Sequence, residues 1–336
     1  MVENSAFAKN RSFLRSVLVL IMAAAVTLSL SSCAGKDDSS EEGEEGGETS
    51  VSEETEVTEF SVKMTPKSKE DFFKNSDNPA VQAAVSAKEE NIADRPAYIT
   101  IKGVEFSTDI TSLTLNAKGL TDEDIADLRY LFDLRELQIY ENDITDLSPL
   151  MGLTELTSLT VFKNDISDLT PLEGLVNLQT LYLRSNNISD ITPLAGLTEI
   201  TNLDLSHNHI SDISALSGMT SMRLLKLNDN EIEDISALGN MSLIDRIHVQ
   251  NNRISDINPL WRMTETTEIY AENNNISDIS VVGEMKNLGW LRLSGNPIED
   301  LSPVYELTEL KKLWITDTGA PTEGLAEALP ECDITY

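Results

Sequence analysis

Two histidines and two acidic residues have the types and spacing that come closest to a metal site. His207 and His209 flank one asparagine, and Asp229 and Glu231 take the same places 22 residues further along the chain. If such segments stack about 4.8 Å apart, as neighbouring strands do, the four side chains could share a cation. We favour solvated histidines paired with acids, because the ligands would lie on a mobile rim. The sequence therefore predicts no resident metal.

Catalytic side chains are sparse. The chain holds three histidines, and His248, placed beside Lys226 if the segments stack, has no serine or cysteine nucleophile next to it. The sequence contains no phosphate-binding loop, HExxH zinc motif or nucleophile elbow. We therefore expect no enzyme activity and no cofactor.

An aspartate column offers two interpretations. A calcium ladder is one, but the chain lacks the glycine-rich nonapeptide of known calcium coils. The other, which we favour, is that each aspartate accepts backbone N–H groups in its own turn, which would keep it ionised despite its neighbours. The column recurs every 22 residues and consists of Asp146, Asp168, Asp190, Asp212, Asp234, Asp256, Asp278 and Asp300.

These residues belong to a repeat that runs through most of the chain. The string NNISDITPL at 186–194 has close copies at 164–172 and 208–216. A fixed period between about 20 and 50 residues predicts a solenoid. The leading asparagine of each copy recurs every 22 residues without an insertion: Asn142, Asn164, Asn186, Asn208, Asn230, Asn252, Asn274 and Asn296.

The apolar positions predict how each coil is built. Before Asn186 they are three residues apart and then two, which indicates a tight return path followed by a short strand at 181–183. A buried unpaired amide costs about 1–3 kcal/mol, so we expect each repeat asparagine to point inward and bond its own coil and the next. The Ser/Thr-Pro pairs, such as Thr192-Pro193, are typical of an N-cap and the first position of a short helical turn.

The pattern LxxLxxLxLxxNxIxDIxxL resembles the 22-residue bacterial leucine-rich repeat of the internalin type, over about residues 109–318. The resemblance implies an α/β solenoid, right-handed and curved, with a concave parallel β-sheet and short helical turns on the convex side. It also implies that the concave face binds another macromolecule, usually a protein.

The N-terminal residues predict a lipid anchor. Residues 1–32 have three basic residues followed by an apolar run at 17–30, which is typical of a signal peptide. The string LSSC at 30–33 resembles the bacterial lipobox and implies that Cys33 is lipidated; two acyl chains suffice for stable attachment. An ordinary secretory signal with a chance cysteine is the alternative. Ala34 and the long acidic segment suit the extracellular face of a Gram-positive cell membrane.

Three further segments complete the organisation. Residues 33–67 form an acidic tether, with eleven acids and no base between 37 and 59. Residues 68–108 are expected to cap the solenoid, with a helix starting at Asn78-Pro79 and a hairpin that turns at Lys102-Gly103. Residues 319–336 should close the other end with a short helix and a last strand. With Cys33 lipidated, Cys332 has no partner for a disulfide and should pack under this cap.

Net charge limits the partners. With a net charge of −32, the chain is not expected to bind nucleic acid. The same charge disfavours contact with anionic membranes except through the lipid anchor. We expect a monomer that binds a protein. A glycan or cell-wall ligand stacked on concave aromatics is the alternative, and an idle solvated sheet is the third interpretation.

The ligand-binding residues are expected among side chains that flank the inward strand positions. These outward positions vary while the inward ones stay constant, as suits a recognition surface. Aromatic and arginine side chains are the commonest hot spots. An alternative for Trp314 is that the C-terminal cap covers it. The candidates are Tyr140, Phe162, Tyr182 and Arg184 toward the N-terminus, and Tyr270, Trp290, Arg292 and Trp314 toward the C-terminus.

Overall fold

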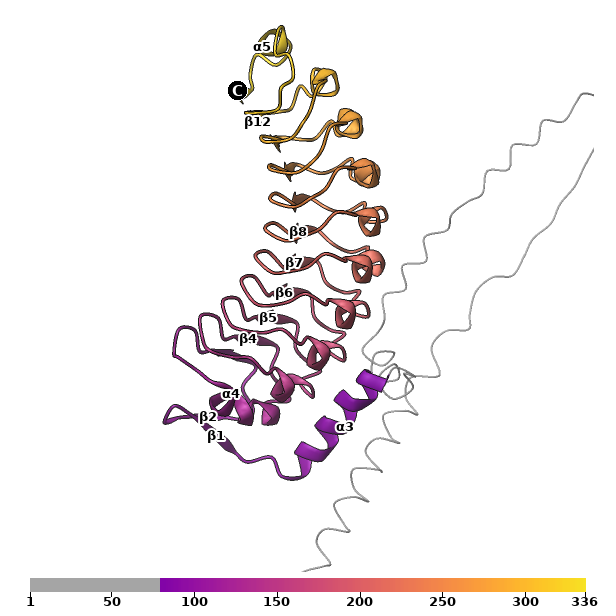
Figure 1. Cartoon of the computed structure of the whole chain (residues 1–336). Helices are drawn as coiled ribbons and strands as arrows, with labels where there is room; N and C mark the ends of the chain where they lie inside the picture. The colour runs from indigo at the N-terminus through magenta and orange to yellow at the C-terminus, as the bar shows by residue number, and fades with distance from the viewer. Residues whose placement is uncertain (1–78) are drawn as a thin grey trace, which may run out of the picture. The chain divides into compact units, whose positions relative to one another are not determined.

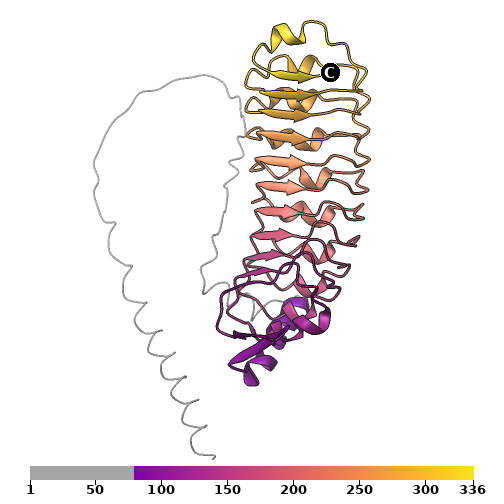
Figure 2. The same cartoon turned by 90° about the vertical axis from the view of Figure 1, so that its left-hand side faces the viewer.

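A parallel sheet dominates the computed structural model, which describes residues 79–336. Its strands follow chain order, each hydrogen-bonded to the next, and they stack along one side while the helical turns stack along the other (Figures 1 and 2). The expected curved α/β solenoid is confirmed. The signal peptide, Cys33, the tether and the expected N-cap Asn78 lie outside the described residues. Eleven strands form the sheet: β3 (Ser112–Thr114), β4 (Glu136–Gln138), β5 (Ser158–Thr160), β6 (Thr180–Tyr182), β7 (Asn202–Asp204), β8 (Leu224–Lys226), β9 (Arg246–His248), β10 (Glu268–Tyr270), β11 (Trp290–Arg292), β12 (Lys312–Trp314) and β13 (Asp333–Thr335).

The constant period sets the register of the sheet. Leu181 in β6 lies opposite Leu159 in β5 and Leu203 in β7, and all three are fully buried. Their neighbours along each strand point the other way, because side chains alternate across a strand. The outward side of the sheet is called the sheet face below. The strand begins at Thr180, one residue before the expected 181–183.

The return path of each coil runs through a 3-10 turn. The Ser/Thr of each Ser/Thr-Pro pair was expected to be the N-cap, and this is wrong. Thr192 is the first residue of its turn, and its N–H donates to Asp190 Oδ1 at 2.8 Å. The cap position is Ile191, and the Thr192 hydroxyl donates to the same carboxylate at 2.7 Å, so Asp190 satisfies the first N–H of the turn. These turns are η2 (Ser148–Leu150), η3 (Thr170–Leu172), η4 (Thr192–Leu194), η5 (Ser214–Gly218), η6 (Ser236–Leu238), η7 (Asn258–Arg262), η8 (Ser280–Glu284) and η9 (Ser302–Val304).

The N-terminal end carries a helix and a hairpin, as expected. Helix α3 (Pro79–Ala93) begins at Pro79, and strands β1 (Tyr98–Ile101) and β2 (Val104–Ser107) pair antiparallel. Lys102 and Gly103 both have positive φ, 47° and 79°, which is the backbone of a tight hairpin turn. The first coil is irregular, with α4 (Asp122–Ile125) and η1 (Ala126–Tyr130) in place of the usual turn.

The C-terminal end adds α5 (Leu325–Ala328) and β13, which pairs with β12. Leu325 is fully buried, and Cys332 packs against the core, partly buried and free; burial raises the pKa of its thiol. Among residues 79–336 no helix has the length and apolar character needed to cross a membrane.

Candidate functional site

The repeat asparagines hold successive coils together. Asn186 Nδ2 donates to Leu183 O of its own coil at 2.9 Å and to Val161 O of the preceding coil at 3.2 Å. Its Oδ1 accepts the N–H of Ile166, also in the preceding coil, at 3.1 Å. We expected each asparagine to bond its own coil and the following one, and the second part is wrong. The Asn186 side chain bonds its own coil and the preceding one. The same three bonds recur in each coil from Asn164 to Asn296.

The two ends of this ladder differ from its middle. Asn142 accepts two backbone N–H groups, from Lys118 and Leu120, and its Nδ2 donates to three carbonyls. It therefore makes more bonds than Asn186. Thr318 takes the asparagine position in the last coil and makes a single bond, from Oγ1 to Ile315 O at 2.9 Å. The ladder is a structural feature and leaves no polar group free for a ligand.

The aspartate column is occupied by its own backbone. Asp212 Oδ1 accepts the N–H of Ser214 at 2.8 Å, and this bond, with a second to the hydroxyl, lowers the pKa of Asp212 below its usual range. The same causes lower the pKa of Asp278 and Asp300. Across residues 79–336, no three His, Cys, Asp or Glu side chains come together as a metal site would require. The geometry fits the interpretation in which each aspartate accepts backbone N–H groups in its own turn.

The two histidines of the candidate metal site do not converge on the acids. His207 lies 3.3 Å from Asp229 through Nε2 and Oδ2, while His209 is exposed. Arg184 also approaches His207, at 3.4 Å between Nη2 and Nε2. His207 belongs to a rim of hydrogen-bonded residues that continues from Asp229 to Asn251.

Side chains of four adjacent strands form one continuous stack on the sheet face. The rings of His248 and Tyr270 lie 4.3 Å apart and nearly parallel. The guanidinium carbon of Arg292 lies 4.1 Å from the Tyr270 ring centroid and 4.2 Å from that of Trp314. Arg292 is therefore held between two aromatic faces. Trp314 is half-buried on the sheet face and lies opposite Thr335 of β13. We call these four residues the aromatic stack.

Glutamates position the stack from its sides. His248 Nε2 is 2.9 Å from Glu268 Oε1, and Arg292 Nη1 is 3.4 Å from Glu272 Oε1. Burial, with a hydrogen bond to Glu268, raises the pKa of Tyr270 to about 12. Burial lowers the pKa of His248 despite the nearby carboxylate. The lowered pKa favours the neutral form of His248 near pH 7.

Trp290 is the exposed aromatic of this region. Its side chain is 41% exposed, and its ring centroid lies 6.5 Å from that of Trp314. Lys312 Nζ lies 5.8 Å from the Trp290 ring and 5.7 Å from the Trp314 ring. The structure therefore brings all four C-terminal candidates into one surface.

The N-terminal candidates form a separate and smaller group. Tyr140 and Phe162 stack with ring centroids 4.3 Å apart. Tyr182 is half-buried on the next strand, and Arg184 is exposed and directed toward the His207 rim. This group lacks an exposed indole.

Sequence reasoning missed two exposed apolar side chains of the repeats. Trp261 is 58% exposed in η7, away from the sheet, with the Arg262 guanidinium 4.7 Å from its ring. Leu243 is 47% exposed just before β9. A signal for Leu243 was available: every equivalent position in the neighbouring repeats is polar, namely Glu155, Asn177, Glu199, Ser221, Glu265, Asn287 and Glu309.

Comparison with known proteins agrees with this geometry. The family described as "Leucine Rich repeats (2 copies)" matches residues 154–196, 176–218 and 198–240. No match is found among curated proteins. Among solved structures, an internalin (inlF) from Listeria monocytogenes is 31% identical over 75% of this chain and 73% of its own, with a TM-score of 0.66.

Two further structures share the fold. Internalin C2 of Listeria monocytogenes is 28% identical over 71% of this chain and 93% of its own, with a TM-score of 0.56. A leucine-rich repeat protein from Leptospira interrogans is 19% identical over 63% of this chain and 62% of its own, with a TM-score of 0.57. The family matched is a repeat scaffold, and no catalytic family is indicated.

Proposed function

Because the chain belongs to the internalin-like leucine-rich repeat proteins, we propose that it is a lipid-anchored surface protein that binds a protein partner through its sheet face. Cys33 would carry the lipid, and the acidic tether at 33–67 would hold the repeats away from the membrane. The binding surface would be centred on the aromatic stack and Trp290.

The single observation that carries this proposal is the exposure of Trp290 beside a rigid stack. Interfaces concentrate their binding free energy in a few aromatic and arginine side chains, surrounded by groups that are already ordered. Tyr270, Arg292 and Trp314 hold one another in place, so little side-chain entropy would be lost on binding. Trp290, beside the aromatic stack, is the exposed side chain that a partner can cover.

Capture of a partner by the immobilised chain tests the proposal. We expect Trp290→Ala to weaken capture by at least about 2 kcal/mol, or roughly thirtyfold, without lowering the melting temperature. Trp261→Ala is the matched control, because Trp261 is more exposed than Trp290 but lies in a helical turn away from the sheet. If Trp290→Ala and Trp261→Ala weaken capture equally, or if only Tyr140→Ala and Phe162→Ala weaken it, the binding site does not lie on this surface. Capture of a glycan with the same Trp290 dependence would replace the protein partner with the alternative ligand.

A further inference from the structure

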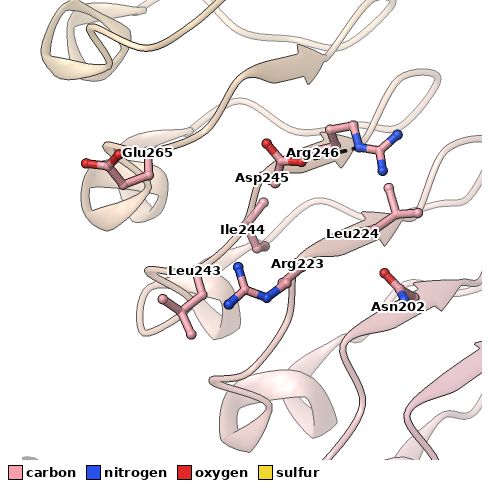
Figure 3. A pocket seen from close by; sticks show the side chains of 8 residues that line it. All are labelled: Asn202, Arg223, Leu224, Leu243, Ile244, Asp245, Arg246 and Glu265. Carbon is pink, nitrogen blue, oxygen red and sulfur yellow. Dashed lines mark ion pairs between the residues drawn. The ribbon is translucent and has the colours of Figure 1, made fainter.

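Two hollows follow each other along the edge of the sheet where the strands begin. The first, of about 320 Å³, lies around the starts of β8 and β9 (Figure 3). The second, of about 550 Å³, lies around the starts of β10 to β12. Glu265 lines both, so they are neighbours along the same edge. We call them the arginine hollow and the tryptophan hollow.

The arginine hollow combines two arginines and two acidic residues, Asp245 and Glu265, with one exposed and one half-buried leucine. Arg223 and Arg246 line it together with Leu224 and Leu243, and Figure 3 shows Arg223 on one coil and Leu243, Asp245 and Arg246 on the next. Arg246 pairs with Asp245 at 3.6 Å. Arg223 has no ion pair among the residues that the structure describes, in a chain of net charge −32. A free guanidinium beside apolar side chains suits a carboxylate next to an apolar group.

The tryptophan hollow has the opposite character. Trp290 lines it with Lys311 and the carboxylates of Glu265, Glu268 and Glu309. Lys312 Nζ also lies 5.8 Å from the Trp290 ring, and Glu268 is paired with His248, which leaves Glu265 and Glu309 for a partner. An aromatic face flanked by carboxylates attracts a cation through the ring quadrupole and through ion pairing. A lysine or arginine side chain of a partner is the group that fits.

We propose that the two hollows bind one extended segment of the partner protein, with an acidic side chain in the arginine hollow and a basic side chain in the tryptophan hollow. The inference rests on the proposed function and adds the chemistry of the segment. Coils are about 4.8 Å apart, so hollows two to three coils apart are about 10–15 Å apart, which an extended chain covers in three or four residues. An apolar side chain near the acid would cover Leu224 and Leu243.

Selection from a phage-displayed library of random peptides of about 12 residues, the length of an extended recognition segment, tests this inference on the full chain. We expect selected peptides to carry an acid and a base about three to five residues apart. The variant Arg223→Glu/Arg246→Glu should weaken a selected peptide at least about tenfold and select a base in place of the acid. The variant Glu309→Lys, which leaves Glu265 of both hollows unchanged, should in the same way select an acid in place of the base.

Matched controls occupy the same repeat positions outside the hollows. Arg135→Glu corresponds to Arg223, and Glu199→Lys corresponds to Glu309. These controls should leave the selected peptides unchanged. The inference is overturned if the charge-exchange variants select the same peptides as the wild-type chain, or if the control variants change the peptides to the same extent. It is also overturned if the selected peptides share no spacing between acid and base. Partner capture that depends on Trp290 but not on Arg223 and Arg246 also overturns it, while leaving the proposed function intact.

Discussion

The guanidinium group of Arg292 lies 4.1 Å from the ring centroid of Tyr270, and its other face covers Trp314 at 4.2 Å. Cation–π contacts of this kind are worth about 0.5–1 kcal/mol at partly exposed sites. The variants Tyr270→Ala, Arg292→Ala and their combination should therefore show a coupling of about that size in urea unfolding.

Tyr270→Phe should retain the coupling, since it keeps the ring. Additive losses in the double variant would mean that the two residues are merely adjacent.

The asparagine ladder should dominate the stability of the central coils. Asn186→Ala removes three hydrogen bonds and leaves the N–H of Ile166 without its acceptor in a buried position. We expect a loss of about 1–3 kcal/mol in the free energy of unfolding, measured by urea titration. Asn187→Ala, at the exposed next position, should change it by less than about 0.5 kcal/mol. Similar values for the two variants would contradict the ladder.

His248 should make the fold sensitive to mild acid. Burial holds its folded pKa below the usual value, although Glu268 and Asp204 oppose this and Lys226 supports it. The unfolded state takes up a proton at about pH 6.5, where the folded state does not, so stability should fall as pH drops below about 6.5. The melting temperature of His248→Gln should decline less between pH 7.5 and 5 than that of the wild-type chain.

His209→Gln, an exposed change, should follow the wild-type chain. A melting temperature of His248→Gln that declines as much as that of the wild-type chain would show that burial of His248 does not set this pH dependence.

The repeat frame was predictable because its period has no insertion. A residue 22 positions from Tyr270 must lie on the neighbouring strand, so the common column of Tyr270, Arg292 and Trp314 followed from numbering alone. The sandwiching of Arg292 did not, because it depends on side-chain rotamers. The cap was misassigned by one residue, since Thr192 is the first residue of its turn and Ile191 the cap position. Aspartate and threonine side chains both bond nearby backbone groups, and here the Asp190 carboxylate accepts the N–H of Thr192. Trp261 was missed because it lies in a turn, outside the strand columns that were compared.

The repeat around Thr266 should open before its neighbours. Thr266 and Ala271 take core positions that hold larger apolar residues in other repeats, and both are buried. The Thr266 hydroxyl donates to Ile244 O at 2.7 Å, which satisfies the polar atom but does not supply the missing volume. We expect faster amide hydrogen exchange at residues 266–274 than at 244–252 and 288–296. Equal protection of the three segments would contradict this.

The contact between α3 and the second coil gives the most local test of the N-terminal end. A Cβ added to Gly152 would lie 3.1 Å from the backbone N of Lys88 and 3.3 Å from its Cα. Helix backbone cannot yield as a flexible side chain does, so Gly152→Ala should push α3 away. Lys88 Nζ would then lose its bond to Thr154 Oγ1, now 3.2 Å long. We expect a lower melting temperature and earlier proteolysis within 79–93.

Gly196→Ala is the matched control, because Gly196 takes the same repeat position and its added Cβ would meet nothing within 4 Å. That change should leave stability unchanged or raise it by up to about 1 kcal/mol, since alanine restricts the unfolded chain. If both glycine variants melt alike and α3 stays protected, the helix does not depend on this close contact. If only Gly152→Ala exposes 79–93 while the repeats keep their protection, α3 is held to the solenoid by this packing.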